Sequence, residues 1–371
     1  MSSTSPVPGS APTPSPTSAG SAREYLPFLD VARVLAVLGV VAIHVIGGGV
    51  SSGESGIAMV ALDMALIAAV PVFFMMSGAL SLDPRALRRG PADFLRRRAS
   101  RILPALVVWS LFYVLAVRMV LGGQRFTGPD VLDMLVGGDA YTHLYFLWAV
   151  AGLYLLTPVL QPFLQPDEGR RAWILGLAAA GWTVLVMALG QLAALELLPA
   201  APLTAGATTF ALMYVGYFVL GRAMLVSPLP RRAAWAALAS PPLFVALLTW
   251  LYEALRDQRD VATPDPWIAM LAPSYVSLPT VLYAVLLMAA VSSLCRGWRV
   301  SERTGRILRR LGEATFGVFL VHFAVLAGLR VVPWLATFDP APMAVCFVVT
   351  IALSTAFALI GARIPGLRRI L

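Results

Sequence analysis

Residues 28–46 read FLDVARVLAVLGVVAIHVI, an apolar stretch that is long enough to cross a bilayer and yet contains Asp30, Arg33 and His44. Eleven positions separate Arg33 from His44. At about 100° per residue both side chains leave the same face of a helix, roughly 16 Å apart along its axis. Asp30 precedes Arg33 by three positions, a spacing at which the two side chains can pair. Charged groups in hydrocarbon cost about 2.5 to 3.5 kcal/mol on insertion scales, so this polar face favours a functional role.

His44 has two interpretations. An imidazole can act as a base near neutral pH, and one that ends a polar face is suited to taking a proton from a hydroxyl group. The alternative is a histidine that only bridges two helices through hydrogen bonds. The alignment with Arg33 and the nearby Asp30 favour the functional interpretation.

The composition of the chain is that of a polytopic membrane protein. Hydrophobic residues make up 59% and charged residues 13% of the chain, and the mean hydropathy is +0.80. The net charge of +9 comes from arginine without lysine, a usage typical of GC-rich bacterial genomes. A basic, aromatic-interleaved soluble domain is missing, so we expect no nucleic-acid partner. Cys295 and Cys346 have no metal spacing to a histidine, and we expect neither a disulfide nor a metal site.

The chain divides into a tail and one membrane domain. Residues 1–22 are almost wholly Ser, Pro, Thr, Ala and Gly and lack the features of a secretory signal, so we expect a disordered tail and a retained first span. Residues 23–371 then form a single transmembrane domain. Ten apolar stretches of roughly 18 to 24 residues predict an all-α bundle, because only helices satisfy their own backbone groups in lipid. The expected spans are 28–46, 57–80, 103–121, 144–163, 172–190, 206–226, 234–252, 276–294, 314–332 and 343–361. Prolines at 71, 158 and 279 predict bends.

Arginines in the loops predict the orientation. Loops on one side of the expected bundle hold clusters at 85–101 and 296–310. The opposite loops hold only Arg125, Arg256 and Arg259. The positive-inside rule therefore predicts that both termini are cytoplasmic, with Arg33 near the cytoplasmic face and His44 in the outer half of the membrane.

The two other histidines lie in or beside later spans. His143 opens the fourth span in residues 142–148, THLYFLW, at the outer level expected for His44. Tyr145 and Trp148 in this segment are typical of an interfacial aromatic belt. His322 lies within the ninth span, and the pattern leaves its structural and functional roles equally open.

A second basic motif precedes the third span. Residues 94–104 read FLRRRASRILP, and most of these arginines are explained as signals of membrane topology. Arg98 and Arg101 are spaced by three, so they can share a helix face and hold a phosphorylated ligand bidentately.

Five short sequence motifs follow one another along the chain. They are Leu29 to Arg33 followed by His44, residues 71–78 (PVFFMMSG), 98–104 (RASRILP), 143–147 (HLYFL) and 316–322 (FGVFLVH). Together with the ten spans, this ordered set resembles the acyltransferase 3 family of membrane acyltransferases, in the stand-alone form without a fused hydrolase-like domain. Members of that family modify sugars of surface polysaccharides, lipid-linked glycans and some natural products. Val31 and Ala32 are a minor departure, since the family usually has a glycine at or close to this position.

The resemblance implies an activity and a site. The donor would be acyl-CoA, usually acetyl-CoA, which binds from the cytoplasm as a co-substrate and not as a permanent cofactor. His44 would be the catalytic histidine with Arg33 as its partner, and Arg98 and Arg101 would contact the donor. The acceptor would be a carbohydrate or glycolipid, and the protein a multi-pass component of the cell (inner or plasma) membrane. We add Asp30 and His143 to the catalytic set, and Arg33 to the residues that bind acyl-CoA. The supporting residues that we expect are Ser77, Tyr145, Trp148 and His322.

These residues suggest a path for the donor. We expect the CoA nucleotide at Arg98 and Arg101, with its acyl-pantetheine arm running along the polar face from Arg33 to His44. His44 would then deprotonate an acceptor hydroxyl from the outer side or take the acyl group itself, and His143 and Tyr145 would orient the acceptor. Selectivity would lie in the expected outer loops, residues 122–142 and 254–275.

Two other functions fit the same residues. A transporter or flippase of a lipid-linked or anionic small molecule would use Asp30, Arg33 and His44 as a substrate or proton pathway, although no repeat relates the two halves of the chain. A noncatalytic scaffold or sensor is the third interpretation. The pattern leaves open the acceptor, the acyl length, the side on which the acceptor is modified and the oligomeric state.

Overall fold

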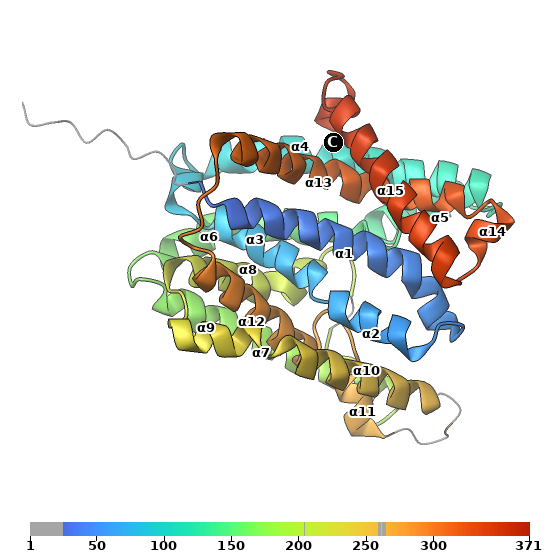
Figure 1. The fold of residues 1–371 in the computed structure, drawn as a ribbon, viewed down its shortest axis with the longest axis horizontal. Helices are drawn as coiled ribbons and strands as arrows, with labels where there is room; N and C mark the ends of the chain where they lie inside the picture. The colour runs from blue at the N-terminus through green and yellow to red at the C-terminus, as the bar shows by residue number, and fades with distance from the viewer. Residues whose placement is uncertain (1–24, 204, 259–260, 262–264) are drawn as a thin grey trace, which may run out of the picture.

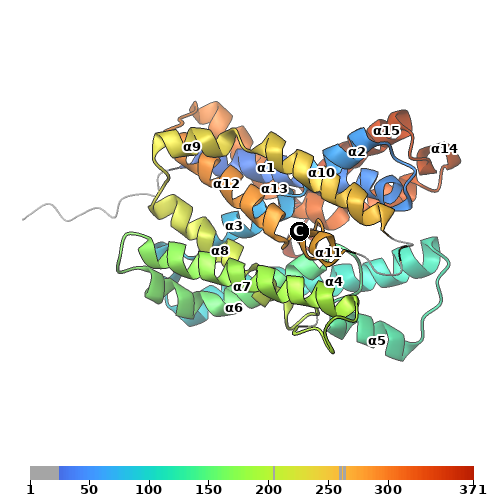
Figure 2. The same cartoon turned by 90° about the horizontal axis from the view of Figure 1, so that it is seen from below.

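The protein is an α-helical bundle. The computed structural model describes residues 25–203, 205–258, 261 and 265–371, and these residues form helices and no strand. Figures 1 and 2 show the long helices side by side along the long axis of the molecule. The expected all-α class is therefore confirmed. The expected tail, residues 1–22, lies outside the described residues, as does Arg259 of the expected outer loops.

Eight segments of the described chain are helical, long and apolar enough to cross a membrane. They are α1 (Pro27–Ser52), α2 with α3 (Ile57–Leu66 and Ala69–Ser81), α4 with the π-helical η2 (Pro91–Phe112 and Tyr113–Leu121), α6 (Tyr145–Leu164), α7 (Arg170–Ala194), α9 with α10 (Arg231–Leu238 and Pro241–Asp257), α13 (Glu302–Leu329) and α15 (Pro340–Gly361). Two shorter apolar helices, α8 (Phe210–Val226) and α12 (Leu278–Leu294), have 17 residues each. Each expected span overlaps one of these segments. Ten crossings and cytoplasmic termini stay predictions, because α8 and α12 are short and no membrane fixes the orientation.

Prolines shape several helices. The second expected span is divided into α2 and α3 just before Pro71, which has no N–H to donate to the Ile67 carbonyl. Pro158 lies inside α6. The prediction of a bend at Pro279 is wrong. This residue lies in the first turn of α12, where a backbone N–H has no helical carbonyl as acceptor, so a proline does not disturb the helix. An unexpected break separates α9 from α10 directly before Pro241, because Pro241 and Pro242 have no N–H to donate to the last carbonyls of α9.

α3 and α8 cross with their backbones in contact. A Cβ atom on Gly78 of α3 would overlap the Phe218 carbonyl oxygen of α8, and one on Gly221 of α8 would overlap the Met75 carbonyl oxygen of α3. Small residues at a helix contact allow this close approach in membranes. The crossing fixes α3, which contributes Ser77 to the site described below.

Short helices lie in the connecting segments. They are η1 (Pro84–Leu87), α5 (Gly128–Gly137), α11 (Pro266–Leu271), α14 (Pro333–Ala336) and η3 (Leu367–Arg369). α5 begins with a capping box, in which the Thr127 side chain accepts from the Asp130 N–H and the Asp130 carboxylate accepts from the Thr127 N–H. Figure 2 shows α5 at one end of the bundle, on the segment that joins η2 to α6.

Candidate active site

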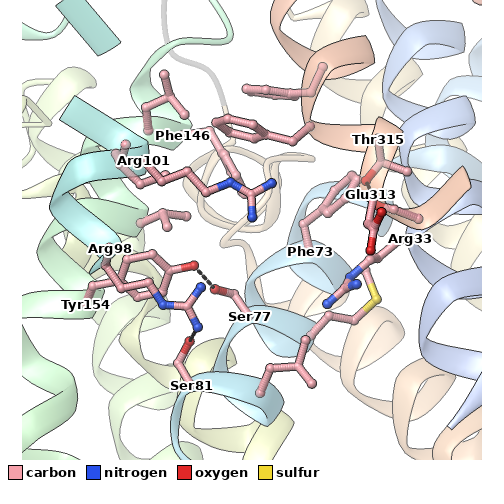
Figure 3. A pocket seen from close by; sticks show the side chains of 18 residues that line it. Arg33, Phe73, Ser77, Ser81, Arg98, Arg101, Phe146, Tyr154, Glu313 and Thr315 are labelled. Carbon is pink, nitrogen blue, oxygen red and sulfur yellow. Dashed lines mark hydrogen bonds between the residues drawn. The ribbon is translucent and has the colours of Figure 1, made fainter. Parts of the chain in front are cut away.

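An arginine-lined cavity of about 220 Å³ lies between α1, α3, α4, α6 and α13. Figure 3 shows Arg98 and Arg101 on the α4 side, while Arg33 of α1 and Glu313 of α13 stand on the opposite wall. The Arg101 guanidinium lies over the Phe316 ring, 5.2 Å from its centroid. The structure therefore brings together the three arginines that the sequence assigned to the donor.

Aromatic rings and hydroxyl groups hold Arg98 in place. Its guanidinium lies 4.7 Å from the centroid of the Tyr154 ring and donates to Ser81 Oγ at 3.4 Å. Ser77 donates to the Tyr154 hydroxyl at 3.3 Å (Figure 3). Among the described residues, neither Arg98 nor Arg101 forms an ion pair with a carboxylate. Their positive charge is therefore open to an anionic ligand in the cavity.

The polar face of α1 begins with a hydrogen-bonded group. Arg33 Nη1 donates to Asp30 Oδ1 at 3.1 Å, and the Tyr25 hydroxyl donates to Asp30 Oδ2 at 2.9 Å. Burial and the hydrogen bond to Asp30 raise the pKa of Tyr25 to about 12. Gly312 of α13 makes room for the carboxylate, because a Cβ atom there would lie 2.7 Å from Asp30 Oδ1. The pairing of Asp30 with Arg33 expected from their spacing is confirmed.

A neighbouring cavity of about 420 Å³ continues the first one around Arg33. Both cavities are lined by Arg33, Leu80 and Glu313. The second adds Arg309, whose guanidinium covers the Tyr25 ring at 4.5 Å from the centroid. Four arginines and two carboxylates, Asp30 and Glu313, line the combined space, so its net charge of about +2 suits a ligand with several phosphates.

All three histidines of the chain meet in one cluster. The rings of His44 (α1) and His322 (α13) stack with centroids 5.4 Å apart, and His143, just before α6, lies 5.1 Å from His322. Phe323 fills the space beside them, 4.2 Å from His44 and 5.0 Å from His143. Three segments that are far apart in the sequence thus place three imidazoles in contact.

The surroundings of the three rings differ. His322 Nδ1 lies 2.7 Å from the Phe319 carbonyl oxygen, which only accepts, so in the neutral ring Nδ1 carries the proton and Nε2 the lone pair. Among the described residues, His322 Nε2 and both ring nitrogens of His143 are buried without a hydrogen-bond partner. His44 is only half-buried, whereas His143 and His322 are fully buried. His44 is therefore the least buried of the three histidines. The described residues contain no group of three His, Cys, Asp or Glu side chains placed to hold a metal ion.

Arg33 and His44 both face α13. Arg33 shares its cavity with Glu313 of that helix, and His44 stacks on His322 of the same helix. The common face that the eleven-residue spacing predicts is therefore confirmed.

An aromatic layer separates the histidine cluster from the arginine-lined cavity. Phe146 and Phe319 line the cavity with ring centroids 5.1 Å apart, and Phe319 lies 5.1 Å from His143. His44 does not line this cavity. The expected continuous path from Arg33 to His44 is not present as one cavity, because the Phe146 and Phe319 rings lie where the arginine-lined cavity approaches the histidine cluster.

Tyr145 and Trp148 lie outside the histidine cluster. The Tyr145 hydroxyl accepts a hydrogen bond from Tyr214 of α8 at 3.5 Å. Trp148 lies against Gly138, where a Cβ atom would be 3.2 Å from the indole ring. The structure therefore packs these two rings against α8 and the end of α5 and does not bring them to the histidines.

Other aromatic residues support the cluster, and the sequence analysis did not identify them. The Tyr113 hydroxyl donates to the Leu320 carbonyl at 2.7 Å and accepts from the Ala324 N–H at 3.2 Å, so it ties η2 to α13 on both sides of His322. Tyr141 stacks on Tyr113 with centroids 4.4 Å apart. The available signal was proximity in the sequence, since Tyr141 lies two positions before a histidine.

A helical bundle with long apolar segments, a buried imidazole cluster and a cationic cavity defines a multi-pass membrane protein with an internal site. Comparison with protein families gives its class. The family model described as an acyltransferase domain, acyltransferase 3, matches residues 26–360, which is nearly the whole chain. The chain belongs to this family, and it is a membrane acyltransferase. No match was found among the curated proteins or among the solved structures compared with it.

Proposed function

We propose that the protein transfers an acyl group, in the simplest case acetyl, from cytoplasmic acyl-CoA to a hydroxyl group of a sugar. The sugar belongs to a surface glycan, a lipid-linked glycan or a secreted natural product, and the protein resides in the cell membrane. The observation that carries the proposal is the clustering of three imidazoles, with His44 stacked on His322, one aromatic layer from an arginine-lined cavity.

The donor binds in the arginine-lined cavity. Arg98 and Arg101 hold phosphate oxygens, since both guanidinium groups face the space without a carboxylate partner among the described residues. Arg33, oriented by Asp30, forms the opposite wall. The adjoining space near Arg309 gives the nucleotide portion of CoA room beyond the cavity.

The acyl-pantetheine arm passes the aromatic layer to reach His44. Phe146 and Phe319 stand where the arm leaves the arginine-lined cavity, so their rings move aside when the donor binds. In the absence of donor the same rings keep cytoplasmic solutes from the histidines. The layer accounts for the closed passage in the structure.

His44 acts as the general base of the transfer. It takes the proton from the acceptor hydroxyl as the oxygen attacks the thioester carbonyl carbon. The carbon–sulfur bond then breaks, and the CoA thiolate takes the proton from His44, so the products are an ester and free CoA. His322 holds the His44 ring by stacking, and its own orientation is fixed by the Phe319 carbonyl.

Acetyl-CoA labelled in the acetyl group tests the proposal. We expect the purified full-length protein in detergent to hydrolyse or transfer the label, and His44→Ala to lose this activity while staying folded. Protein that binds acetyl-CoA and never turns it over would contradict enzymatic transfer and favour a carrier.

A further inference from the structure

A third cavity, of about 730 Å³, lies at the far ends of η2, which continues α4, and of α13. We call it the distal cavity. Its polar lining residues are Arg118, Gln124, Asp139, Tyr141, Thr142 and Arg330. Arg118 follows Arg98 by 20 positions on the continuous α4 and η2 segment, roughly 25 Å or more along its axis. The distal cavity is therefore separate from the arginine-lined cavity of the donor.

The distal cavity adjoins the histidine cluster. Arg330 Nη2 donates to the carbonyl of Val45, the residue after His44, at 2.8 Å. Tyr141 has its ring 5.8 Å from His143 and 5.0 Å from Phe323. A molecule in the distal cavity is thus one side chain away from the imidazoles, on the side opposite the donor.

Two guanidinium groups in the distal cavity are held by neutral partners. Arg118 donates to Gln124 Oε1 at 2.9 Å and lies over the Phe126 ring at 4.6 Å. Arg330 lies over the Phe338 ring at 5.2 Å. Within the described part of the chain neither arginine forms an ion pair.

One carboxylate faces these two cations. The exposed Asp139 is the acidic residue of the lining, so the distal cavity carries a net charge of about +1. Burial raises the pKa of Tyr141, and Arg118 and Arg330 oppose that rise, so both cations lie near the phenol. Placing an arginine at the end of an apolar helix costs free energy, because its charge lies near hydrocarbon. An arginine on the expected outer side also departs from the usual excess of basic residues on the cytoplasmic side.

We propose that the distal cavity binds the acceptor through an anionic group, a carboxylate or a phosphate, held by Arg118 and Arg330, which places an acceptor hydroxyl at His44. This inference rests on the proposed acyl transfer and narrows its acceptor to an acidic sugar or a sugar phosphate. The guanidinium fork suits both anions because it donates two parallel hydrogen bonds. The Tyr141 ring provides a face for the sugar.

Binding of three small probes to the full-length protein in detergent tests the inference. The probes are methyl β-glucuronide, glucose 1-phosphate and the neutral methyl β-glucoside, and the shift of melting temperature with probe concentration gives each affinity. We expect at least one anionic probe to bind about tenfold or more tightly than the neutral one, and the tighter of the two identifies carboxylate or phosphate. Arg118→Gln and Arg330→Gln should each lose about tenfold of this binding. Arg125→Gln removes an exposed arginine outside the distal cavity and should leave it unchanged.

Several results would overturn the inference. These are equal affinity for charged and neutral probes, no binding of either anion, or loss of binding in Arg98→Gln with retention in Arg330→Gln. Because Arg330 also holds the Val45 carbonyl, Arg330→Lys serves as a folded variant that keeps the charge. Acetyl-CoA turnover is measured on the same preparations. If turnover is absent while anion binding still depends on Arg118, the proposed function fails and the anion site stands.

Discussion

Among single residues, the three histidines differ in burial and in the contacts that hold their rings. His143 and His322 are fully buried, and the Phe319 carbonyl fixes the ring of His322. His44 is half-buried and stacks on His322 and Phe323. His44 is thus the least buried of the three histidines, and its packed neighbours hold its ring in place, as the proposed base requires.

Replacing His44 tests its role. We expect His44→Ala to lower the rate of acyl transfer about 10²- to 10⁴-fold, the range typical of a lost general base. Melting temperature and elution volume in detergent should stay close to those of the wild type. A variant that retains wild-type turnover would remove His44 from the chemistry.

Replacing Arg98 tests the donor cavity. Arg98→Ala removes a charge-assisted contact to phosphate, so it should raise the KM for acetyl-CoA about tenfold or more. It should change kcat less, because in the proposed complex the Arg98 guanidinium lies far from the reacting atoms. Arg88→Ala is a matched control, since Arg88 is exposed and does not line the arginine-lined cavity. Equal effects of the two variants would mean that Arg98 supplies only general positive charge.

At the scale of helices, the crossing of α3 and α8 holds one wall of the site. Gly78→Ala should destabilise the protein by about 1 to 3 kcal/mol, because the added methyl group meets the backbone carbonyl of Phe218 and neither helix can yield locally. Gly181→Ala in α7 is the control, since a Cβ atom there has no neighbour within 4 Å. Thermal unfolding in detergent compares the two, and similar melting temperatures would show that the helices do not pack as described.

The aromatic layer of Phe146 and Phe319, between α6 and α13, is tested by removing one of its rings. Phe319→Ala should open the arginine-lined cavity toward His143, and acetyl-CoA hydrolysis without acceptor should rise as water reaches the thioester. Phe316→Ala, which removes a ring of the same cavity that lies over Arg101, should not raise hydrolysis in this way. A fall in hydrolysis for Phe319→Ala would contradict a closing role for its ring.

The helices show how far sequence reasoning reaches. The common face of Arg33 and His44 was predictable, because helical periodicity alone decides it. The meeting of His44 with His143 and His322 was not, since it depends on how α1, α6 and α13 pack. The same holds for Phe319, which the sequence presents as one apolar residue among many.

The distal cavity was missed for a different reason. The positive-inside rule weighs arginines in loops, whereas Arg118 and Arg330 lie within or at the end of expected spans. An arginine in such a position is itself a signal, because hydrocarbon rarely tolerates it without a function. The loop that holds Tyr141 was expected to govern selectivity. Tyr141 lines the distal cavity.

At the scale of the whole molecule, two cationic cavities lie on opposite sides of one imidazole cluster. In the proposed function, the arginine-lined cavity serves the donor, the distal cavity serves the acceptor, and the aromatic layer between α6 and α13 separates the donor from the histidine cluster.

A structure of the full-length protein with a non-hydrolysable acetyl-CoA analogue tests this account most directly. We expect the phosphates at Arg98 and Arg101, the rings of Phe146 and Phe319 displaced, and the carbonyl carbon of the analogue within about 4 Å of the His44 imidazole, the distance of a reactive contact. An analogue whose acyl group ends below an undisturbed aromatic layer, or lies outside the bundle, would contradict it.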